Sequence, residues 1–316
     1  MGRSGMEETV RIPSARIEGT IELDDARSIG FAEYGEPDGD AIFWFHGTPG
    51  GRRQIPPRAR ELAGERGVRL IGVERPGTGH STAHLHDSLA AAAGDVEQIA
   101  DRLNIERFGV VGLSGGGPYV LACAHELPER VVAGAVLGGV APVRGDDAAP
   151  GGPVALAGRL SPLLEVVHQP LGHAFWGAVF ALRPLASQAF DLFIGTMPEG
   201  DQEVMSRPEM KHMFMDDLLR ASRLQLHAPL YDLVLFTRPW GFSLRDIRVP
   251  IRFWHGDADH LVPLAHGEHQ AALVPDSDLQ VRPREGHMGS LDAAEEIIDS
   301  ILELWPRGKK SRPARA

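Results

Sequence analysis

Short apolar runs alternate along this chain with stretches of helical periodicity, and this alternation restricts the fold more than any other feature. The runs Val68–Val73 and Phe108–Leu113 are apolar on both faces, as expected of strands that helices cover on both sides. Between them, apolar residues recur at helical spacing in Ser88–Leu103. A strand–helix–strand rhythm of this kind favours a mostly parallel sheet between two layers of helices.

Further segments extend this rhythm toward both ends of the chain. Strands are expected at Arg27–Tyr34, Ala41–Phe45, Val132–Val140, Ile251–Trp254 and Leu279–Val281. Helical patterns follow the last two of these runs at Leu264–Leu273 and Leu291–Leu304. The turn residues Gly35-Glu-Pro-Asp-Gly39 separate the first two runs and predict a β-hairpin there.

The rhythm changes between Pro142 and Leu244. This segment is rich in methionine and aromatic residues, the latter being Phe175, Trp176, Phe180, Phe190, Phe193, Phe214, Tyr231, Phe236, Trp240 and Phe242. We expect an all-helical insertion, interrupted by prolines, that covers the sheet as a lid. The predicted organisation is therefore a discontinuous α/β core of residues 1–141 and 245–306, a helical cap of residues 142–244, and a basic, disordered tail of residues 307–316.

Composition excludes several classes of protein. The 316 residues suit one large α/β domain, and 43% hydrophobic with 24% charged residues is close to the globular average. A formal charge of -11 disfavours nucleic acid as the main partner, because such a surface repels phosphates. Cys123 is the only cysteine, which excludes an intramolecular disulfide and a multi-cysteine zinc site.

No membrane span is expected either. No stretch reaches the roughly 18 uninterrupted apolar residues that a membrane helix needs, and Met1–Arg11 contains no apolar signal core. A single cysteine is compatible with a reducing compartment. The sequence therefore predicts a cytoplasmic protein whose partner is a small molecule.

The segment Gly112-Leu-Ser-Gly-Gly116 matches the pattern G-x-S-x-G. It follows the expected strand Phe108–Leu113 and precedes a helical pattern at Pro118–Glu126, which is the context that this motif requires. Ser114 at such a strand-to-helix elbow is exposed beside a helix N-terminus, whose dipole favours an oxyanion. Ser114 is therefore the candidate nucleophile, since the G-K-[ST] of a phosphate-binding loop is absent.

A serine nucleophile needs a base, and the base needs an orienting acid. His287, in Glu285-Gly-His-Met-Gly-Ser290, follows the last strand-like run and is the candidate base. Asp259 is the favoured acid because it occupies a D-x-x-V-P turn, and Asp257, closer to the preceding strand, is the second choice. The chain order serine, acid, histidine is that of an α/β-hydrolase.

An oxyanion hole needs two N–H donors aimed at one point. The segment Phe45-His-Gly-Thr-Pro-Gly50 follows the strand Ala41–Phe45, and proline has no N–H, so Thr48 is the expected donor. Gly115, after the nucleophile, is the second donor. His46 and Gly47 are expected to support this loop without transferring protons.

Five motifs follow one another after expected strands, and they span Phe45 to His287. They are His46-Gly-Thr-Pro49, Glu74-Arg-Pro-Gly-Thr-Gly-His-Ser81, Gly112-Leu-Ser-Gly-Gly116, Gly256-Asp-Ala-Asp259 and Gly286-His287. In this order the chain resembles α/β-hydrolase-fold enzymes that carry a helical cap after the sixth strand. The resemblance implies a mostly parallel eight-stranded sheet with helices on both faces, and a Ser-His-Asp hydrolase acting on esters, amides or related acyl groups.

Three branches of the family depart from this chain. Haloalkane dehalogenases and epoxide hydrolases carry aspartate where this chain has Ser114. Proline iminopeptidases are similar around His46 and Glu74-Arg-Pro-Gly77, but they usually have tryptophan at the position of Gly115. The favoured substrate is therefore a carboxylic ester with an apolar acyl or alcohol part, and neither a metal nor an organic cofactor is expected.

Three alternatives remain open at this stage. A proline-type aminopeptidase needs acidic cap residues to hold a free amine, for which Glu165, Glu199, Glu203 and Glu209 are available. Hydrolytic cleavage of a carbon–carbon bond uses the same triad. A non-catalytic ligand-binding protein on the same scaffold is the alternative from another class, because fold alone does not guarantee catalysis.

Other polar residues are interpreted more simply. His80, His84 and His86 are expected on a solvated loop, and Asp95 and Glu97 on a solvated helix face. Cys123 is expected to be buried as a small hydrophobe. His255, Asp257, Asp259 and His260 crowd together, but they lack the histidine pattern of a metal site, so no metal is assigned to them.

Overall fold

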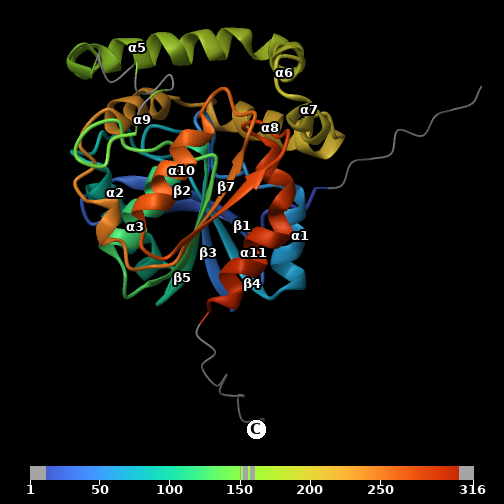
Figure 1. Cartoon of the computed structure of the whole chain (residues 1–316). Helices are drawn as coiled ribbons and strands as arrows, with labels where there is room; N and C mark the ends of the chain where they lie inside the picture. Colours follow the sequence, from blue (N-terminus) through green and yellow to red (C-terminus); the bar gives the residue numbers. More distant parts are fainter. Residues whose placement is uncertain (1–11, 150, 152–155, 157–160, 306–316) are drawn as a thin grey trace, which may run out of the picture.

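The computed structural model describes residues 12–149, 151, 156 and 161–305, and it contains an eight-stranded sheet (Figure 1). The strands lie in the order β1-β2-β4-β3-β5-β6-β7-β8. Their bounds are β1 Ile17–Glu22, β2 Ser28–Gly35, β3 Asp40–Phe45, β4 Val68–Val73, β5 Phe108–Leu113, β6 Val131–Leu137, β7 Ile251–Gly256 and β8 Ser277–Arg282. Pairing is parallel from β4 to β8 and antiparallel at β1–β2 and β2–β4, which confirms the predicted mostly parallel sheet.

Helices cover both faces of this sheet, as predicted. α1 (Pro57–Glu65) and α11 (Ala294–Glu303) pack on one face, and α2 (Leu89–Arg102), α3 (Gly117–Glu126) and α10 (Leu264–Leu273) pack on the other. Strand β3 shows why the runs are apolar throughout. Its Ile42 and Trp44 enter the core under α1 and α11, whereas Phe43 and Phe45 enter the core under α2 and α3.

The hairpin predicted at Gly35–Gly39 is wrong. Strand β4 lies between β2 and β3, so these two strands do not pair, and β2 forms its hairpin with β1 instead. The turn crosses the start of β4, where Val68 O accepts the Glu36 N–H at 2.8 Å. Gly35 has a φ of +76°, and a Cβ there would lie 2.3 Å from Val68 O, so the turn glycine serves this close crossing.

Strand β1 was not predicted from the sequence. It is an edge strand whose residues Ile17–Glu22 are mostly exposed or half-buried, and only Ile21 is buried. A segment of this kind carries little of the apolar signal that marks a central strand. The pairing of its whole length with β2 is what defines it.

Between β6 and β7, where the insertion was predicted, the structure has five α-helices with described bounds. They are α5 (Ser161–Leu182), α6 (Ala186–Ile194), α7 (Glu199–Met205), α8 (Pro208–Ala221) and α9 (Ala228–Phe236), and they cover one end of the sheet (Figure 1). Prolines open η2 (Arg183–Leu185), α8 and α9, where a missing N–H costs nothing. Pro170 departs from the expected pattern, since it lies inside α5 rather than between helices. The predicted 307–316 tail is outside the described residues.

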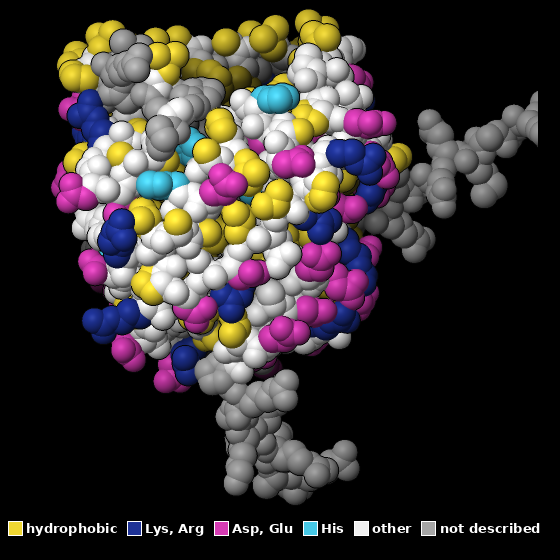
Figure 2. Space-filling model, viewed as in Figure 1, with side chains coloured by type: hydrophobic (Ala, Val, Ile, Leu, Met, Phe, Trp, Pro, Cys, Tyr) yellow, Lys and Arg dark blue, Asp and Glu magenta, His cyan; other side chains and the backbone are white. Residues whose placement is uncertain are grey.

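The outer helices α5 and α6 expose many apolar side chains, which gather along the upper edge in Figure 2. Leu163 and Val166 of α5 and Leu192 of α6 are all more than half exposed. Even so, none of the helices in the described part of the chain is both long enough and apolar enough to span a membrane.

His86 and Asp95 were expected in solvent but are buried. Asp95, on α2, accepts hydrogen bonds from Arg27 Nη1 at 2.8 Å and Nη2 at 2.6 Å, and its Oδ2 lies 3.1 Å from His86 Nε2. Burial alone raises the pKa of Asp95, but the bonds from His86 and Arg27 outweigh it and hold the pKa below the ordinary value. Glu97, on the same helix, is exposed as expected.

We predict that Asp95→Ala lowers the free energy of unfolding by about 2 kcal/mol, because it removes the acceptor of Arg27 Nη1, Arg27 Nη2 and His86 Nε2 and leaves Arg27 with Asp25 alone. Glu97→Ala, on the exposed face of the same helix, should change it by less than about 0.5 kcal/mol. Urea denaturation of both variants at neutral pH measures the difference. Equal effects of the two substitutions would contradict a stabilising role of the Arg27–Asp95 pair.

Candidate active site

Ser114 occupies a sharp turn between β5 and α3. Its φ of +53° is rare for a residue with a side chain and is typical of strained functional turns. The backbone crowds this turn: a Cβ on Gly112 would lie 2.4 Å from Gly116 O, and one on Gly116 would lie 2.4 Å from Phe45 O. Only glycine fits these two positions, which is the physical reason for the G-x-S-x-G pattern.

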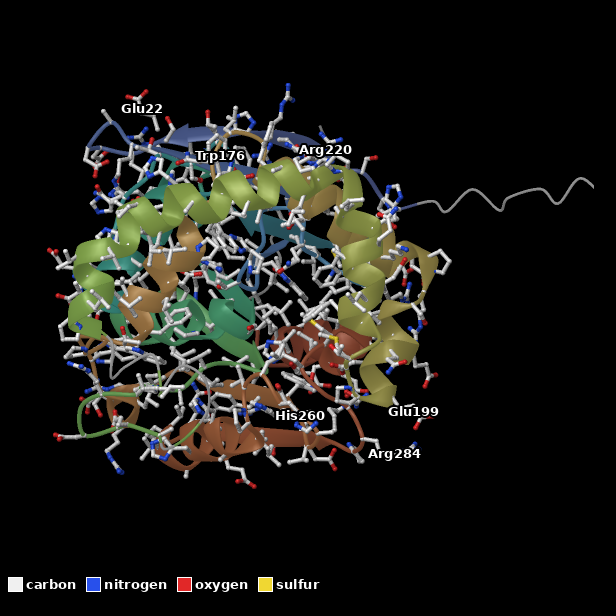
Figure 3. All side chains as sticks on the ribbon, turned by 90° about the horizontal axis from the view of Figure 1, so that it is seen from above. Glu22, Trp176, Glu199, Arg220, His260 and Arg284 are labelled. Carbon is white, nitrogen blue, oxygen red and sulfur yellow. The ribbon has the colours of Figure 1, made fainter. Side chains whose placement is uncertain are left out.

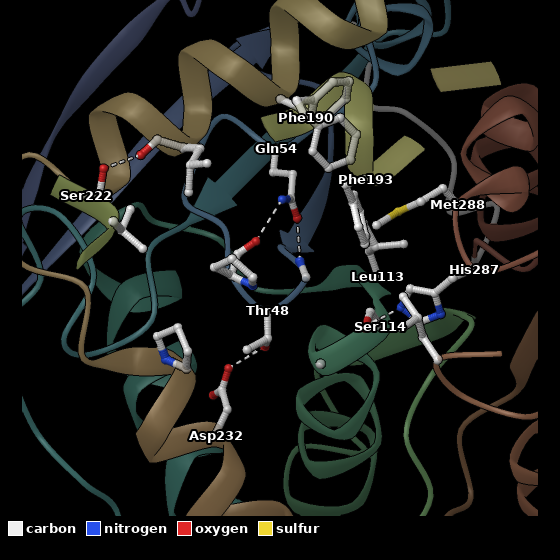
Figure 4. A pocket seen from close by; sticks show the side chains of 18 of the residues that line it. Thr48, Gln54, Leu113, Ser114, Phe190, Phe193, Ser222, Asp232, His287 and Met288 are labelled. Carbon is white, nitrogen blue, oxygen red and sulfur yellow. Dashed lines mark hydrogen bonds between the residues drawn. The ribbon is translucent and has the colours of Figure 1, made fainter. Parts of the chain in front are cut away.

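The structure brings Ser114 and His287 together. His287 Nε2 lies 2.7 Å from Ser114 Oγ, although the two residues are 173 positions apart in the chain (Figure 4). His287 is buried in the loop after β8. An imidazole nitrogen at this distance is within reach of the serine proton, as a general base must be.

Asp259 lies on the other side of the same imidazole. Its Oδ2 is 2.7 Å from His287 Nδ1, and its Oδ1 accepts the N–H groups of Leu261 and Val262, both at 2.8 Å. Burial alone raises the pKa of Asp259, but the hydrogen bonds from His287 and Val262 hold it below the ordinary value. Asp259 is therefore an anion at neutral pH, suited to orient the imidazole and stabilise its cation.

The second-choice acid, Asp257, does not face the imidazole. Its Oδ1 accepts the Arg284 N–H at 2.7 Å, and the residue is exposed. His255 Nε2 donates to Val262 O at 2.8 Å, while His260 is exposed (labelled in Figure 3). Within the described residues, no group of three or more histidine, cysteine, aspartate or glutamate side chains is arranged to hold a metal ion.

Thr48 and Gly115 lie against one another beside Ser114. A Cβ on Gly115 would lie 2.2 Å from Thr48 Oγ1, so glycine is needed for this approach. In the described part of the chain, neither the Thr48 N–H nor the Gly115 N–H donates to a protein acceptor. Both residues line the same cavity as Ser114 and His287. Two free N–H groups are thus available next to the serine.

His46 and Gly47 lie behind this loop. His46 is fully buried; its Nδ1 donates to Gly47 O at 2.7 Å, and its Nε2 accepts the Arg75 N–H at 3.3 Å. Burial, aided by the Arg75 charge, lowers the pKa of His46 well below its ordinary value, so this histidine is neutral. Gly47 N–H donates to Gln54 Oε1 at 2.6 Å. These contacts fix the loop that carries Thr48.

Sequence reasoning missed a buried ion pair beside the same loop. Arg75 Nη2 lies 2.8 Å from Asp232 Oδ2 and also donates to Gly47 O and Thr48 Oγ1, both at 2.9 Å. Asp232, on α9, accepts further bonds from Thr48 Oγ1 at 2.5 Å and from Tyr119 OH at 2.8 Å. The sequence did contain a signal for this pair: Asp232 is the one charged residue in the otherwise apolar Ala228–Phe236. A carboxylate buried with such a helix needs a charged or hydrogen-bonding partner elsewhere in the fold.

A cavity of about 540 Å³ opens in front of Ser114 and His287. The helices between β6 and β7 supply most of its wall, mainly through Val179, Leu182, Ala186, Phe190, Phe193, Met205, Phe214, Met215, Leu218, Leu233 and Phe236. Figure 4 shows Leu113, Phe193 and Met288 next to the serine and histidine. The cavity is therefore an apolar chamber with a few polar groups at its floor.

Glu165, Glu199, Glu203 and Glu209 do not line this cavity. Glu165 pairs with Arg238 at 3.1 Å. Within the described residues, Asp232 is the one carboxylate in the lining, and Arg75, Thr48 and Tyr119 already occupy its oxygens. The acidic residues considered for binding an amine thus do not converge.

Comparison with known proteins identifies the family to which this fold belongs. A family model described as "alpha/beta hydrolase fold" matches residues 40–294. A probable proline iminopeptidase from Leptolyngbya boryana is 23% identical over 321 residues, which cover 92% of this chain and 96% of that protein.

Solved structures show the same fold. A thermophilic esterase from Thermogutta terrifontis aligns with a TM-score of 0.65 at 19% identity, covering 91% of this chain and 97% of that one. The esterase RhEst1 from Rhodococcus sp. ECU1013 aligns with a TM-score of 0.61 at 21% identity, covering 93% and 100%.

We predict that a fluorophosphonate probe labels Ser114 covalently, because a serine beside an imidazole is activated for attack on phosphorus as well as carbon. Asp259→Asn should slow this labelling by roughly 10³- to 10⁴-fold, since an imidazole without its acid adopts the wrong tautomer. Asp257→Asn, the matched control, should label at a rate close to that of the wild type. The reverse ranking would assign the orienting role to Asp257.

Proposed function

The chain belongs to the α/β-hydrolase fold family, and we propose that it is a serine hydrolase that cleaves carboxylic esters of small or medium apolar molecules. One observation carries the proposal: a continuous hydrogen-bonded line of Ser114, His287 and Asp259 faces an apolar cavity. A site with these groups in bonding distance also argues against a purely ligand-binding role, although fold membership alone does not.

The proposed reaction has two halves. Ser114 Oγ attacks the ester carbonyl carbon while His287 Nε2 takes its proton, and Asp259 stabilises the resulting imidazolium. The N–H groups of Thr48 and Gly115 bind the oxyanion of the tetrahedral intermediate. Its collapse breaks the carbon–oxygen bond, His287 gives the proton to the leaving alcohol, and an acyl group stays on Ser114. Water activated by His287 then releases the carboxylic acid and restores the serine.

The same geometry supports a role for the inserted helices. We propose that residues 142–244 act as a cap whose inner side forms the acyl pocket, over a core of residues 1–141 and 245–306. The substrate then meets apolar walls from α5, α6, α8 and α9. A cytoplasmic location remains part of the proposal, in keeping with the buried, unpaired Cys123.

A second candidate is a proline-type aminopeptidase, because the Leptolyngbya boryana relative that matches nearly the whole chain carries that name. Such a reaction needs a group that binds a free amine. Asp232 is the cavity's carboxylate within the described residues, and its partners Arg75, Thr48 and Tyr119 leave it little capacity for an amine. Ester hydrolysis is therefore the better-supported activity.

We predict that Ser114→Ala abolishes turnover while the protein stays folded. The loss should be on the order of 10³-fold or more, since the members of such a triad act as a unit. Hydrolysis of p-nitrophenyl butyrate measures the activity, and far-UV circular dichroism checks the fold. Retention of more than about a tenth of the wild-type rate would remove Ser114 from its proposed role.

We also predict that ester selectivity rises from acetate to butyrate or longer chains and then falls when the cavity is full. Each CH₂ buried against the apolar wall contributes up to about 0.8 kcal/mol, or roughly fourfold in affinity. The measurement is kcat/KM for a series of p-nitrophenyl esters, beside proline β-naphthylamide.

Two results would contradict this expectation. A steady fall in kcat/KM from acetate onward would show that the cavity does not hold the acyl chain. A clear preference for proline β-naphthylamide would replace the esterase proposal with the aminopeptidase.

A further inference from the structure

We propose that Asp201, a buried carboxylate on α7, is a positioning residue that holds the His287 loop in its working geometry. The inference rests on the proposed function, in which His287 is the general base. It makes an inserted helix part of the catalytic arrangement rather than only a wall of the pocket. Asp201 touches neither Ser114 nor the imidazole in the described hydrogen bonds, so its effect passes through the backbone.

Asp201 accepts three backbone N–H groups from the loop that carries His287. Its Oδ1 accepts from Gly286 at 2.8 Å and from Gly289 at 2.9 Å, and its Oδ2 accepts from Met288 at 3.0 Å. The donors lie on both sides of His287 in the chain. One carboxylate thus grips the segment immediately before and immediately after the proposed base.

Among the described residues, these three N–H groups have no acceptor other than Asp201. The loop follows the end of β8, so its N–H groups have left the ladder of the sheet, and Asp201 is completely buried. A buried N–H without an acceptor costs about 1–3 kcal/mol, and a bond to a carboxylate is stronger than one to a neutral acceptor. The loop therefore takes this conformation only while α7 is docked against it.

Two glycines allow the helix and the loop to approach this closely. A Cβ on Gly286 would lie 2.6 Å from Asp201 Oδ2, and a Cβ on Gly200 would lie 2.8 Å from Arg284 O. In Figure 3, Glu199 at the start of α7 and Arg284 lie at the same edge of the molecule, in keeping with the approach of Gly200 to Arg284 O. The glycine before His287 thus serves this contact with the inserted helix.

The three bonds from Asp201 act as a clamp on the His287 loop, and the position of the imidazole is narrowly constrained, so this clamp should affect catalysis. Its two ring nitrogens lie 2.7 Å from Ser114 Oγ and 2.7 Å from Asp259 Oδ2, so one ring orientation must satisfy both. A displacement of about 1 Å in a reacting group costs roughly 100-fold in rate. A loosened loop should therefore lower kcat far more than it raises KM, since only Met205 of α7 and Met288 of the loop belong to the apolar wall.

Neighbouring inserted helices use carboxylates in the same way on other loops. Asp217, on α8, accepts the N–H groups of Gly51 at 2.8 Å and Arg53 at 2.9 Å, just after the Thr48 segment. Burial raises the pKa of Asp217 to about 7, and the two N–H bonds oppose this shift. Asp232, on α9, bonds to Thr48 itself. Asp201 differs from both because it acts on the proposed base.

The test compares Asp201→Asn and Asp201→Ala with a matched control, Asp292→Asn. The amide oxygen of asparagine retains an acceptor for part of the clamp, whereas alanine retains none. Asp292 lies on η4 (Gly289–Ala293) and pairs with Arg207 at the surface, so its variant weakens contact between the same regions without touching the His287 segment. The readouts are kcat and KM for p-nitrophenyl butyrate, per site titrated with a fluorophosphonate.

We expect kcat per titrated site to fall about 10-fold in Asp201→Asn and about 100-fold in Asp201→Ala, with KM close to the wild-type value. Asp292→Asn should keep the wild-type kcat. If Asp201→Ala does not fold, Asp201→Asn alone decides the question. The proposal is overturned if kcat per site is unchanged, if KM rises instead, or if Asp292→Asn loses as much.

This outcome is separable from a failure of the proposed function. If Ser114→Ala still hydrolyses the ester, the serine mechanism is wrong and the clamp has no base to position. If Ser114 is essential and the Asp201 variants keep their kcat, the serine mechanism stands and only the clamp is wrong.

Discussion

Covering the carboxyl edge of the sheet with helices buries loop N–H groups that the strands no longer satisfy, and the arrangement of the site depends on how these groups find acceptors. Asp201 and Asp217 meet this demand from α7 and α8, each by accepting backbone N–H groups of a core loop. An unsatisfied buried donor costs about 1–3 kcal/mol. The packing of α7 and α8 on the core and the conformation of the core loops therefore depend on the same hydrogen bonds.

The buried charges of Arg75 and Asp232 also need hydrogen-bonding partners, as the buried N–H groups do. A buried ion pair adds little net stability, because desolvation offsets its attraction, but removing one partner is costly. Here the guanidinium also donates to Gly47 O and the carboxylate accepts from Thr48 and Tyr119, so each charge is satisfied several times. These bonds fix the positions of the Thr48 loop, α3 and α9 relative to one another. The apolar cavity then forms between fixed walls, with Ser114 at its floor.

Much of the core was predictable because its determinants are local. The runs Val68–Val73 and Phe108–Leu113 are strands with the predicted bounds, since burial on both faces leaves a continuous apolar signal. The Gly35–Gly39 turn was misread as a hairpin, because turn chemistry does not reveal that β4 enters between the two strands. Asp95 was misplaced in solvent for a related reason: its partners Arg27 and His86 lie outside its helix.

For the site, the sequence by itself determined which groups lie at the ends of strands: a serine in a glycine-lined turn and, later, an aspartate and a histidine after successive strands. These depend on short-range sterics and strand order, which a linear pattern records. The D-x-x-V-P turn already favoured Asp259 over Asp257 as the acid, but only the tertiary structure shows that Asp259 contacts His287 while Asp257 does not. Only the tertiary structure, too, shows that Asp201 and Asp232 reach the core loops. A side chain's partner across 85 or 184 positions is set by how the helices pack on the sheet, and no local pattern encodes that packing.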